Sequence, residues 1–295
     1  MANVTANRTV VELHQQPREW QRALHRLLHN PLTILGLMLV VLALACAIFA
    51  PLIAPYDPIL GNLRDHLQTP SAVHAFGTDN FGRDILSRTI YGSQVSLKIA
   101  LGVQVITLAV GLVLGLIAGY YGGVIDAVIM RIADIVMSFP LLIIAIALVG
   151  VLGSTDGNII AALALVSWPY VTRLARSQVL TIKEQDYITA AHSLGATDMI
   201  IMLRHILPNL LTPIVVYVTL SIGSVILSEA SLSFLGLGSG DASQPSWGKM
   251  LNESRALIRS AWWLPFFPGV AILLTVLGFN LLGDGLRDAL DVRSQ

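Results

Sequence analysis

Six long apolar runs divide this chain, and they constrain its fold more than any other feature. About 20 consecutive apolar residues are enough to cross a bilayer as a helix. Only 12% of the residues are charged, about half of the quarter that is typical of soluble domains. We therefore predict an all-α polytopic membrane protein with six transmembrane helices, at residues 32–54, 95–120, 132–152, 158–172, 211–234 and 262–282.

Lysine and arginine are divided unequally between the two sets of connecting segments. Cytoplasmic segments carry an excess of these residues, and the set that includes both termini holds eleven, against seven in the other set. Both termini are therefore predicted to be cytoplasmic. The eleven are Arg8, Arg18, Arg22, Arg26, Arg131, Arg173, Arg176, Lys183, Arg204, Arg287 and Arg293; the seven are Arg64, Arg83, Arg88, Lys98, Lys249, Arg255 and Arg259.

The remaining composition narrows the classes of function. The formal net charge is zero, which gives no indication of a nucleic-acid partner. Cys46 is the only cysteine, so an intrachain disulfide is excluded. The seven histidines form no metal-ligand cluster and none lies in a predicted span, and there is no GxSxG motif, so an intramembrane hydrolase is disfavoured. We expect no catalytic, cofactor or metal site on this chain.

A row of glycines lies on one face of the second predicted span. Gly111, Gly115 and Gly119 are spaced four residues apart, and small residues at this spacing let two helix backbones approach closely within a membrane. We predict that this face packs tightly against another helix of the bundle.

The segment between the fourth and fifth runs, YITAAHSLGATDMIIMLRHILP (187–208), is longer than a simple connection requires. Ala190, Ala191 and Leu194 share one helical face, and Gly195 is suited to end that helix. Thr197 or Asp198 is placed to cap a second short helix from about residue 199 to 205, which Pro208 would close before the next span. Periodicity alone leaves two interpretations open, a docking surface for another protein and an amphipathic helix on the membrane surface.

This segment resembles the EAA loop of ABC-importer permeases, in which E-A-A-x-x-x-G is followed after nine residues by I-x-L-P. Ala190, Ala191, Gly195 and Pro208 fit that spacing, whereas Thr189 stands where the family usually has Glu. Five further stretches are similar to the second permease subunit of dipeptide, oligopeptide and nickel importers: FGTDNFGRDILSR (76–88), GYYGGVIDAVIMRIADIVMSFP (119–140), SEASLSFLGLG (228–238), PSWGKML (245–251) and FNLLGDGLRDALD (279–291).

The resemblance implies a fold of one N-terminal helix and a five-helix permease core of the methionine-importer type, in the bacterial or archaeal cytoplasmic membrane. It divides the chain into a cytoplasmic tail (1–31), a first transmembrane helix with an extracytoplasmic loop (32–92), a permease core (93–284) with a cytoplasmic coupling loop (178–210), and a cytoplasmic C-terminal tail (285–295). The coupling residues that it implies are Tyr187, Thr189, Ala190, Ala191, Gly195, Asp198, Leu207 and Pro208.

The implied partners are a homologous permease subunit in a heterodimer, two ATPase subunits and an extracytoplasmic substrate-binding protein. ATP and Mg²⁺ would be bound by the ATPase subunits. The sequence agrees, because it has no GxxxxGK[ST] phosphate-binding loop; Gly248-Lys249 is followed by Met250 and lacks the upstream glycine.

Charged residues in and beside the spans suggest further sites. Glu229 in the fifth run, with Ser228 and Ser231, is a candidate for the translocation path or its gate, since a carboxylate in a span is a functional hypothesis by default. The alternative is a carboxylate satisfied by the nearby serines at a helix interface. Arg131 and Asp134 are spaced to pair on one helix face and to form a cytoplasmic rim.

The predicted extracytoplasmic loops hold a second set of polar and aromatic residues. Asp79, Arg83 and Asp84 are expected to form a turn that caps a short surface helix from Ile85, or else to touch the binding protein. The loop at residues 236–261 is long enough to dip back toward the pore. The aromatic side chains expected to act as interfacial anchors are Trp247, Trp262 and Trp263.

The cargo implied by the resemblance is a dipeptide or oligopeptide. Glutathione and nickel are the alternatives for the same architecture, and nickel is disfavoured by the lack of a His-rich or Met-rich stretch in the spans. An alternative from another class, an ATP-independent channel or secondary transporter, gives no account of the elaborate cytoplasmic loop.

Overall fold

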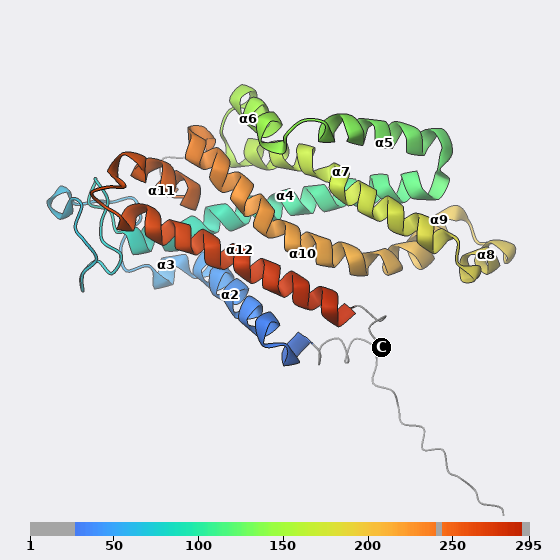
Figure 1. The fold of residues 1–295 in the computed structure, drawn as a ribbon, viewed down its shortest axis with the longest axis horizontal. Helices are drawn as coiled ribbons and strands as arrows, with labels where there is room; N and C mark the ends of the chain where they lie inside the picture. The colour runs from blue at the N-terminus through green and yellow to red at the C-terminus, as the bar shows by residue number, and fades with distance from the viewer. Residues whose placement is uncertain (1–26, 240–243, 291–295) are drawn as a thin grey trace, which may run out of the picture.

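The computed structural model describes residues 27–239 and 244–290, and within those ranges the fold is almost entirely helical (Figure 1). Five helical stretches are long and apolar enough to cross a membrane: α2 (Pro31–Ile48), α4 (Ile85–Tyr121), α7 (Asp156–Lys183), the stretch Asp198–Leu237 that contains α10 (Leu207–Leu232), and α12 (Trp263–Leu290). A bent pair, α5 (Gly123–Met137) and α6 (Leu141–Leu152), supplies a sixth. Five of the predicted spans are confirmed with different bounds, and the bent pair accounts for the sixth when it is counted as one span.

The third span is broken rather than straight, which corrects the single helix expected at residues 132–152. α5 ends at Met137, α6 begins at Leu141, and the two are bent by 85°. Pro140 occupies the N-cap of α6. Proline lacks the N–H that a continuous helix requires and disfavours helical geometry in the residue before it, so the chain turns there.

The second span begins ten residues earlier than expected. The short surface helix predicted after Asp84 is wrong, because Ile85 is the first residue of the 37-residue helix α4. The predicted capping role of Asp84 is confirmed, since its Oδ2 accepts a hydrogen bond from the Ser87 N–H at 2.8 Å. The predicted division of the chain at residues 92 and 93 therefore falls inside one continuous helix.

The glycine row joins α4 to α7, as the sequence predicts. A Cβ added at Gly115 would lie 2.5 Å from the Cβ of Ala175, and one added at Gly111 would lie 2.6 Å from the Cβ of Val171. Such distances leave no room for a side chain, so α4 and α7 are in direct backbone contact and form one closely packed pair.

α2 packs along α12 by a similar device. A Cβ added at Gly36 of α2 would lie 2.7 Å from the Cβ of Leu281, and a Cβ added at Gly278 of α12 would lie 2.8 Å from the Cβ of Leu39. After α2, Phe49 interrupts the helix and the four-residue helix α3 (Ala50–Ile53) follows. In Figure 1 α2 and α12 lie side by side, and α10 packs against the other side of α12.

One end of the bundle is covered by a compact layer that we call the cap, made of residues 55–84 and 244–262. It contains the 3-10 helices η1 (Leu63–Asp65) and η4 (Arg255–Leu257) and the helix α11 (Trp247–Ser254). The π-helical stretch η3 (Ser233–Leu237) directly follows α10 and comes before the second cap segment in the sequence.

Buried indoles hold the cap together, which corrects the prediction that all three tryptophans are interfacial anchors. The Trp247 Nε1–H donates to the Thr89 carbonyl oxygen at 2.9 Å, and the Trp263 Nε1–H donates to the Thr78 carbonyl oxygen at 3.1 Å. Both side chains are buried, and only Trp262 is exposed. Four of the residues in the long loop at 236–261, residues 240–243, lie outside the described residues, and dipping of that loop toward the pore stays a prediction.

A network of buried charges also ties the cap to α4. Asp79 Oδ2 accepts from Arg83 Nε and from Arg88 Nη1, each at 2.6 Å, and Glu253 Oε2 accepts from Arg88 Nη2 at 2.8 Å. Asp79, Arg83 and Asp84 are therefore engaged within the chain. The cap has its own internal bonding rather than a free charged surface at these positions.

Candidate functional site

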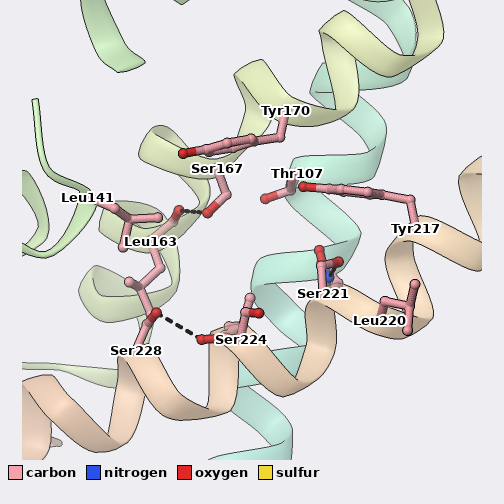
Figure 2. A pocket seen from close by; sticks show the side chains of 12 residues that line it. Thr107, Leu141, Leu163, Ser167, Tyr170, Tyr217, Leu220, Ser221, Ser224 and Ser228 are labelled. Carbon is pink, nitrogen blue, oxygen red and sulfur yellow. Dashed lines mark hydrogen bonds between the residues drawn. The ribbon is translucent and has the colours of Figure 1, made fainter. Parts of the chain in front are cut away.

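A hollow of about 420 Å³ opens on the face formed by α4, α7 and α10. Ligand sites for small molecules commonly have volumes of about 300–1,000 Å³. Figure 2 shows side chains from the three helices converging on this hollow. Its lining consists of Gln104, Thr107, Leu141, Leu163, Ser167, Tyr170, Tyr217, Leu220, Ser221, Ser224, Val225 and Ser228.

Helical periodicity places the polar lining. Tyr217, Ser221, Ser224 and Ser228 recur at intervals of three or four residues in α10, so that they share one face of the helix. Ser167 and Tyr170 are similarly spaced in α7. This row of hydroxyl-bearing residues was the signal in the sequence from which the hollow could have been predicted.

The hollow is lined by hydroxyl and amide groups and by apolar side chains, with no charged group among them. The Ser167 hydroxyl donates to the Leu163 carbonyl oxygen at 2.7 Å, and the Ser228 hydroxyl donates to the Ser224 carbonyl oxygen at 2.9 Å (Figure 2). Since each hydroxyl oxygen keeps lone pairs after donating, the lining can accept hydrogen bonds from a passing molecule.

Two lining residues on α4 extend this polar character. The Gln104 amide donates to the Ser221 hydroxyl and, at 3.1 Å, to the Val218 carbonyl oxygen, which links α4 to α10. The Thr107 hydroxyl is buried without a hydrogen-bond partner. A buried hydroxyl without a partner is uncommon in folded proteins, and this one lies at the hollow.

A second hollow, of about 470 Å³, lies along the same helix toward the start of α10. It shares Tyr217 and Leu220 with the first, and these two side chains therefore stand between the two hollows. The rest of its lining comes from Leu174, Gln178, Thr212, Pro213, Val216, Arg287 and Leu290. One face of α10 thus carries two consecutive hollows.

The residues that the sequence suggested for the path separate in the structure. Ser228 lines the first hollow. Glu229 is fully buried instead, where its carboxylate accepts hydrogen bonds from the Ser233 hydroxyl at 2.7 Å and the Ser96 hydroxyl at 3.1 Å. Ser231 is half-buried and donates to the Leu227 carbonyl oxygen. A gating role for Glu229 stays a prediction, and these contacts place it between helices rather than in the hollow.

The EAA-like loop (178–210) lies at the end of the bundle opposite the cap (Figure 1). Its first helix, α8 (Asp186–Ser193), ends in a Schellman motif. The Ala196 N–H donates to the Ala191 carbonyl oxygen at 3.1 Å, and the Gly195 N–H donates to the His192 carbonyl oxygen at 2.9 Å. Gly195 has φ +84°, a backbone conformation that glycine adopts freely and most other residues avoid. The predicted stop at Gly195 is confirmed.

The second loop helix does not close at Pro208, which corrects the prediction. α9 (Asp198–Ile200) continues through the π-helical stretch η2 (Ile201–Ile206) directly into α10. The Leu207 N–H donates to the Met202 carbonyl oxygen, five residues back. Pro208 lies in the first turn of α10, and its missing N–H is tolerated there because the π register has already altered the hydrogen-bond ladder.

The predicted caps of this second helix are only partly as expected. Thr197 occupies the N-cap position but its side chain makes no capping hydrogen bond. Asp198 accepts instead from the Tyr120 hydroxyl of α4, at 2.7 Å.

The loop presents small and apolar side chains to its surroundings. Leu194 is 88% exposed, Ala190 is exposed and Ala191 is half-buried. An open hollow of about 440 Å³ lies on this surface, lined by Tyr187, Ala190, Ala191, Leu194, Gly195, Ala196 and His205. The remaining residues named from the sequence, Thr189, Asp198, Leu207 and Pro208, lie elsewhere in the loop and do not line this hollow.

Ion pairs at the same end of the bundle connect α5 to α7. Asp126 pairs with Arg176, with 2.6 Å between Oδ2 and Nη2, and Asp134 pairs with Arg173. The predicted Arg131–Asp134 pair is therefore wrong. A partner on the neighbouring helix competes successfully with one on the same helix, because the α5–α7 contact brings Arg173 to Asp134.

Comparison with protein families identifies the class of protein. Residues 111–294 match the binding-protein-dependent transport system inner membrane component. The chain belongs to this family. Residues 19–70 match the N-terminal transmembrane domain of oligopeptide transport permease C. The chain is thus a permease of the ABC-importer type, a transport subunit rather than a catalytic one.

Individual relatives are similar over almost the whole permease. The chain is 48% identical to the dipeptide transport system permease protein DppC of Alkalihalophilus pseudofirmus, over 92% of this chain and 89% of the relative. It is 47% identical to the glutathione transport system permease protein GsiD of Escherichia coli, over 96% of this chain and 93% of the relative. The predicted dipeptide cargo and the glutathione alternative therefore both appear among the names of its relatives.

A solved structure shares the fold of the permease core. A chain of the inward-facing MetNI methionine ABC transporter superposes with a TM-score of 0.59, at 19% sequence identity, over 70% of this permease and 97% of that chain. The predicted methionine-importer type of core is confirmed at the level of fold.

Proposed function

We propose that this permease imports short peptides, from dipeptides to oligopeptides and glutathione, by lining half of a translocation path that is driven by partner ATPases. The observation that carries the proposal is the pair of hollows along α10. The first hollow, which we call the upper hollow, offers hydroxyl and amide groups without a charge. Such a lining can exchange hydrogen bonds with the backbone of any peptide, while it has no charged group to hold one particular side chain.

The names of the relatives support the same cargo. A dipeptide permease and a glutathione permease are similar to this chain to almost the same degree. Glutathione is itself a short peptide, so the uncharged, hydrogen-bonding lining of the first hollow suits both. Among the described residues, no group of three or more His, Cys, Asp or Glu side chains is arranged to hold a metal ion.

The partners follow from the family and from the two open surfaces. A homologous permease would complete the path opposite α4, α7 and α10. Two ATPase subunits would bind at the EAA-like loops, one on each permease, and a substrate-binding protein would deliver peptide at the cap. The loop's exposed Leu194 and Ala190, beside the hollow of about 440 Å³, suit a partner that inserts side chains there.

The membrane orientation that we propose places the EAA-like loop in the cytoplasm. α2 begins, and α12 ends, toward the same end of the bundle as this loop (Figure 1). Both termini would then be cytoplasmic, in agreement with the excess of arginine and lysine in that set of segments. The tail with Arg8, Arg18, Arg22 and Arg26 lies outside the described residues.

Transport by the assembled complex tests the cargo. The permease, its partner permease and both ATPase subunits would be reconstituted in proteoliposomes. The substrate-binding protein would be supplied on the side of the cap and ATP on the side of the EAA-like loops. We expect ATP-dependent uptake of a labelled dipeptide, with competition by other dipeptides. Uptake of labelled glutathione with no uptake of the dipeptide would restrict the cargo to glutathione, and uptake of Ni²⁺ without peptide uptake, or peptide uptake without ATP, would overturn the proposal.

Gly195 provides a test of the coupling role of the loop. An added Cβ would have no atom within 4 Å, so substitution acts through backbone strain rather than collision. Gly195→Val should strain the positive φ, whereas Gly195→Asn should be tolerated because asparagine enters this region more readily. We expect Gly195→Val to abolish most of the ATP hydrolysis stimulated by loaded binding protein, with normal membrane insertion, and Gly195→Asn to retain it. Equal stimulation in both variants and the parent would contradict the coupling role.

A further inference from the structure

A single tyrosine at the end of α4 joins both helices of the EAA-like loop. The Tyr120 hydroxyl donates to Asp198 Oδ1 at 2.7 Å and lies 3.3 Å from His192 Nε2. His192 belongs to α8 and Asp198 to α9, so one hydroxyl touches the helix before the Gly195 turn and the helix after it. This contact fixes the loop relative to α4.

The end of α7 is drawn to the same tyrosine. The Lys183 ammonium group donates to the Tyr120 carbonyl oxygen at 2.6 Å and lies 5.6 Å from the centre of its ring. Tyr120 is buried, and its ring belongs to an apolar cluster that includes Ile188 of α8 and Ile201 at the start of η2. α4, α7 and the loop are therefore bonded at one point by polar contacts on the surface of a shared core.

The connection from the loop to α10 has a different character, although the chain is continuous there. It runs through the π-helical stretch η2, with Pro208 in the following turn and Pro213 further inside α10. Proline removes a backbone hydrogen bond and π-helical stretches interrupt the regular ladder. The connection from the loop to α10 should therefore bend more easily than the connection from the loop to α4 at Tyr120.

We infer that Tyr120 is the positioning residue through which a displacement of the EAA-like loop moves the α4–α7 pair. The flexible stretch η2 allows α10 to move less than that pair. α4 and α7 carry Gln104, Thr107, Ser167 and Tyr170, which form one wall of the upper hollow, whereas α10 carries Tyr217 and the three serines of the other. Movement of the loop would thus shift one wall of the hollow against the other. The inference rests on the proposed coupling role of the loop.

Two adjacent tyrosines give a matched test. Tyr120→Phe removes the hydroxyl that contacts Asp198 and His192, while Tyr121→Phe makes the same chemical change at a side chain that is exposed. In the reconstituted complex, we expect Tyr120→Phe to keep the ATP hydrolysis stimulated by loaded binding protein but to lower the peptide transported per ATP by about tenfold, the factor expected for losing a hydrogen bond to a carboxylate. Tyr121→Phe should leave this ratio unchanged.

A distance measurement distinguishes positioning from a general loss of structure. In a Cys46→Ala background, spin labels at Ser193→Cys on α8 and Val113→Cys on α4 report the separation of loop and helix in the assembled complex. With Tyr120 present, we expect one narrow distance distribution that is preserved when nucleotide is trapped. With Tyr120→Phe, the distribution should broaden or shift on nucleotide trapping while the spectrum of each single label stays unchanged.

The acceptor offers an independent variant should Tyr120→Phe assemble poorly. Asp198→Ala should uncouple to the same extent, and the double variant should be no worse than either single change, because all three lack the same bond. Tyr120→Phe and Asp198→Ala that both transport as much peptide per ATP as Tyr121→Phe would overturn the inference. If Gly195→Val also left the stimulated ATP hydrolysis unchanged, the coupling role of the loop itself would be contradicted. If Gly195→Val abolished that stimulation while the Tyr120 and Asp198 variants behaved like Tyr121→Phe, only the role of Tyr120 would be contradicted.

Discussion

The two ends of this permease differ in where they place their polar and charged side chains. At the cap, charged and aromatic side chains are buried: Asp79 pairs with Arg88 of α4, and Trp263 of α12 donates to the Thr78 carbonyl oxygen. In the EAA-like loop, apolar side chains such as Leu194 face outward. The cap therefore holds its shape through contacts within the chain, whereas the loop leaves exposed the surface at which we propose that an ATPase subunit binds.

Because of this difference, we expect substitutions at the two ends to change different measurable quantities. A change in the buried network of the cap should lower the stability of the permease itself. A change on the exposed surface of the loop should leave the permease folded and weaken its assembly. The following variants test that expectation, in order of decreasing effect.

The largest effect is expected for Asp79→Asn in the cap. The change removes one of the two carboxylates that compensate the buried Arg88 guanidinium, and leaves Glu253 as the other. Breaking a buried ion pair by removing one partner costs about 3–5 kcal/mol, so we expect a lower thermal midpoint and faster hydrogen exchange in residues 55–84. Asp57→Asn is the control, because this exposed side chain accepts from the Ile59 and Leu60 N–H groups through Oδ1, an atom that asparagine retains. An equal loss of stability in both variants would contradict the importance of the buried network.

An intermediate effect is expected for Leu194→Ser, and on assembly alone. Leu194 is 88% exposed, so folding of the free permease should not change. If an ATPase subunit buries this side chain, its loss should weaken binding by about 1.5–3 kcal/mol, measured as the dissociation constant of that subunit for the permease in nanodiscs. Leu60→Ser is the matched control, since Leu60 is similarly exposed but lies in the cap. Unchanged binding by Leu194→Ser would remove this face from the proposed interface.

The smallest effect is expected for Lys98→Met. The Lys98 ammonium group lies 3.0 Å from Asp156 Oδ2, but the lysine side chain is largely exposed. Exposed ion pairs contribute about 0–1 kcal/mol, so the thermal midpoint should barely move. A loss as large as that of Asp79→Asn would show that burial is not what distinguishes the charges of the cap.

Much of this architecture could be predicted from the sequence because two signals are strong within membranes. Long apolar runs indicate spans, and the structure has five helices able to cross a membrane and a bent pair that makes a sixth when counted as one span. The glycine row at Gly111, Gly115 and Gly119 predicts close helix packing, and Gly195 predicts a helix end; both depend on backbone geometry that few other residues allow.

Errors arose where tertiary contacts decide the outcome. Trp247 and Trp263 have the composition of interfacial anchors, but carbonyl oxygens at Thr89 and Thr78 accept their indole N–H groups inside the cap. Asp134 pairs across helices with Arg173, a partner that local spacing cannot reveal. The effect of Pro208 depended on a π-helical register that no sequence pattern announced.

The functional site was predictable only in part for the same reason. The EAA-like loop is contiguous in sequence, so its residues could be named together. The upper hollow draws Gln104, Ser167 and Tyr217 from three helices, and only their packing brings them to one place. Glu229 drew attention as a charge within a span, yet its carboxylate faces Ser96 and Ser233 between helices.

The open side of the hollows has a consequence for the cell that makes this protein. Both hollows are clefts on one face of the chain rather than enclosed tubes. A lone copy in the bilayer therefore offers ions no sealed aqueous route, and lipid tails can cover its polar groove. In the proposed heterodimer, subunits could therefore be inserted one at a time without dissipating the membrane potential, because the conduit would form only when the partner permease supplies the second wall.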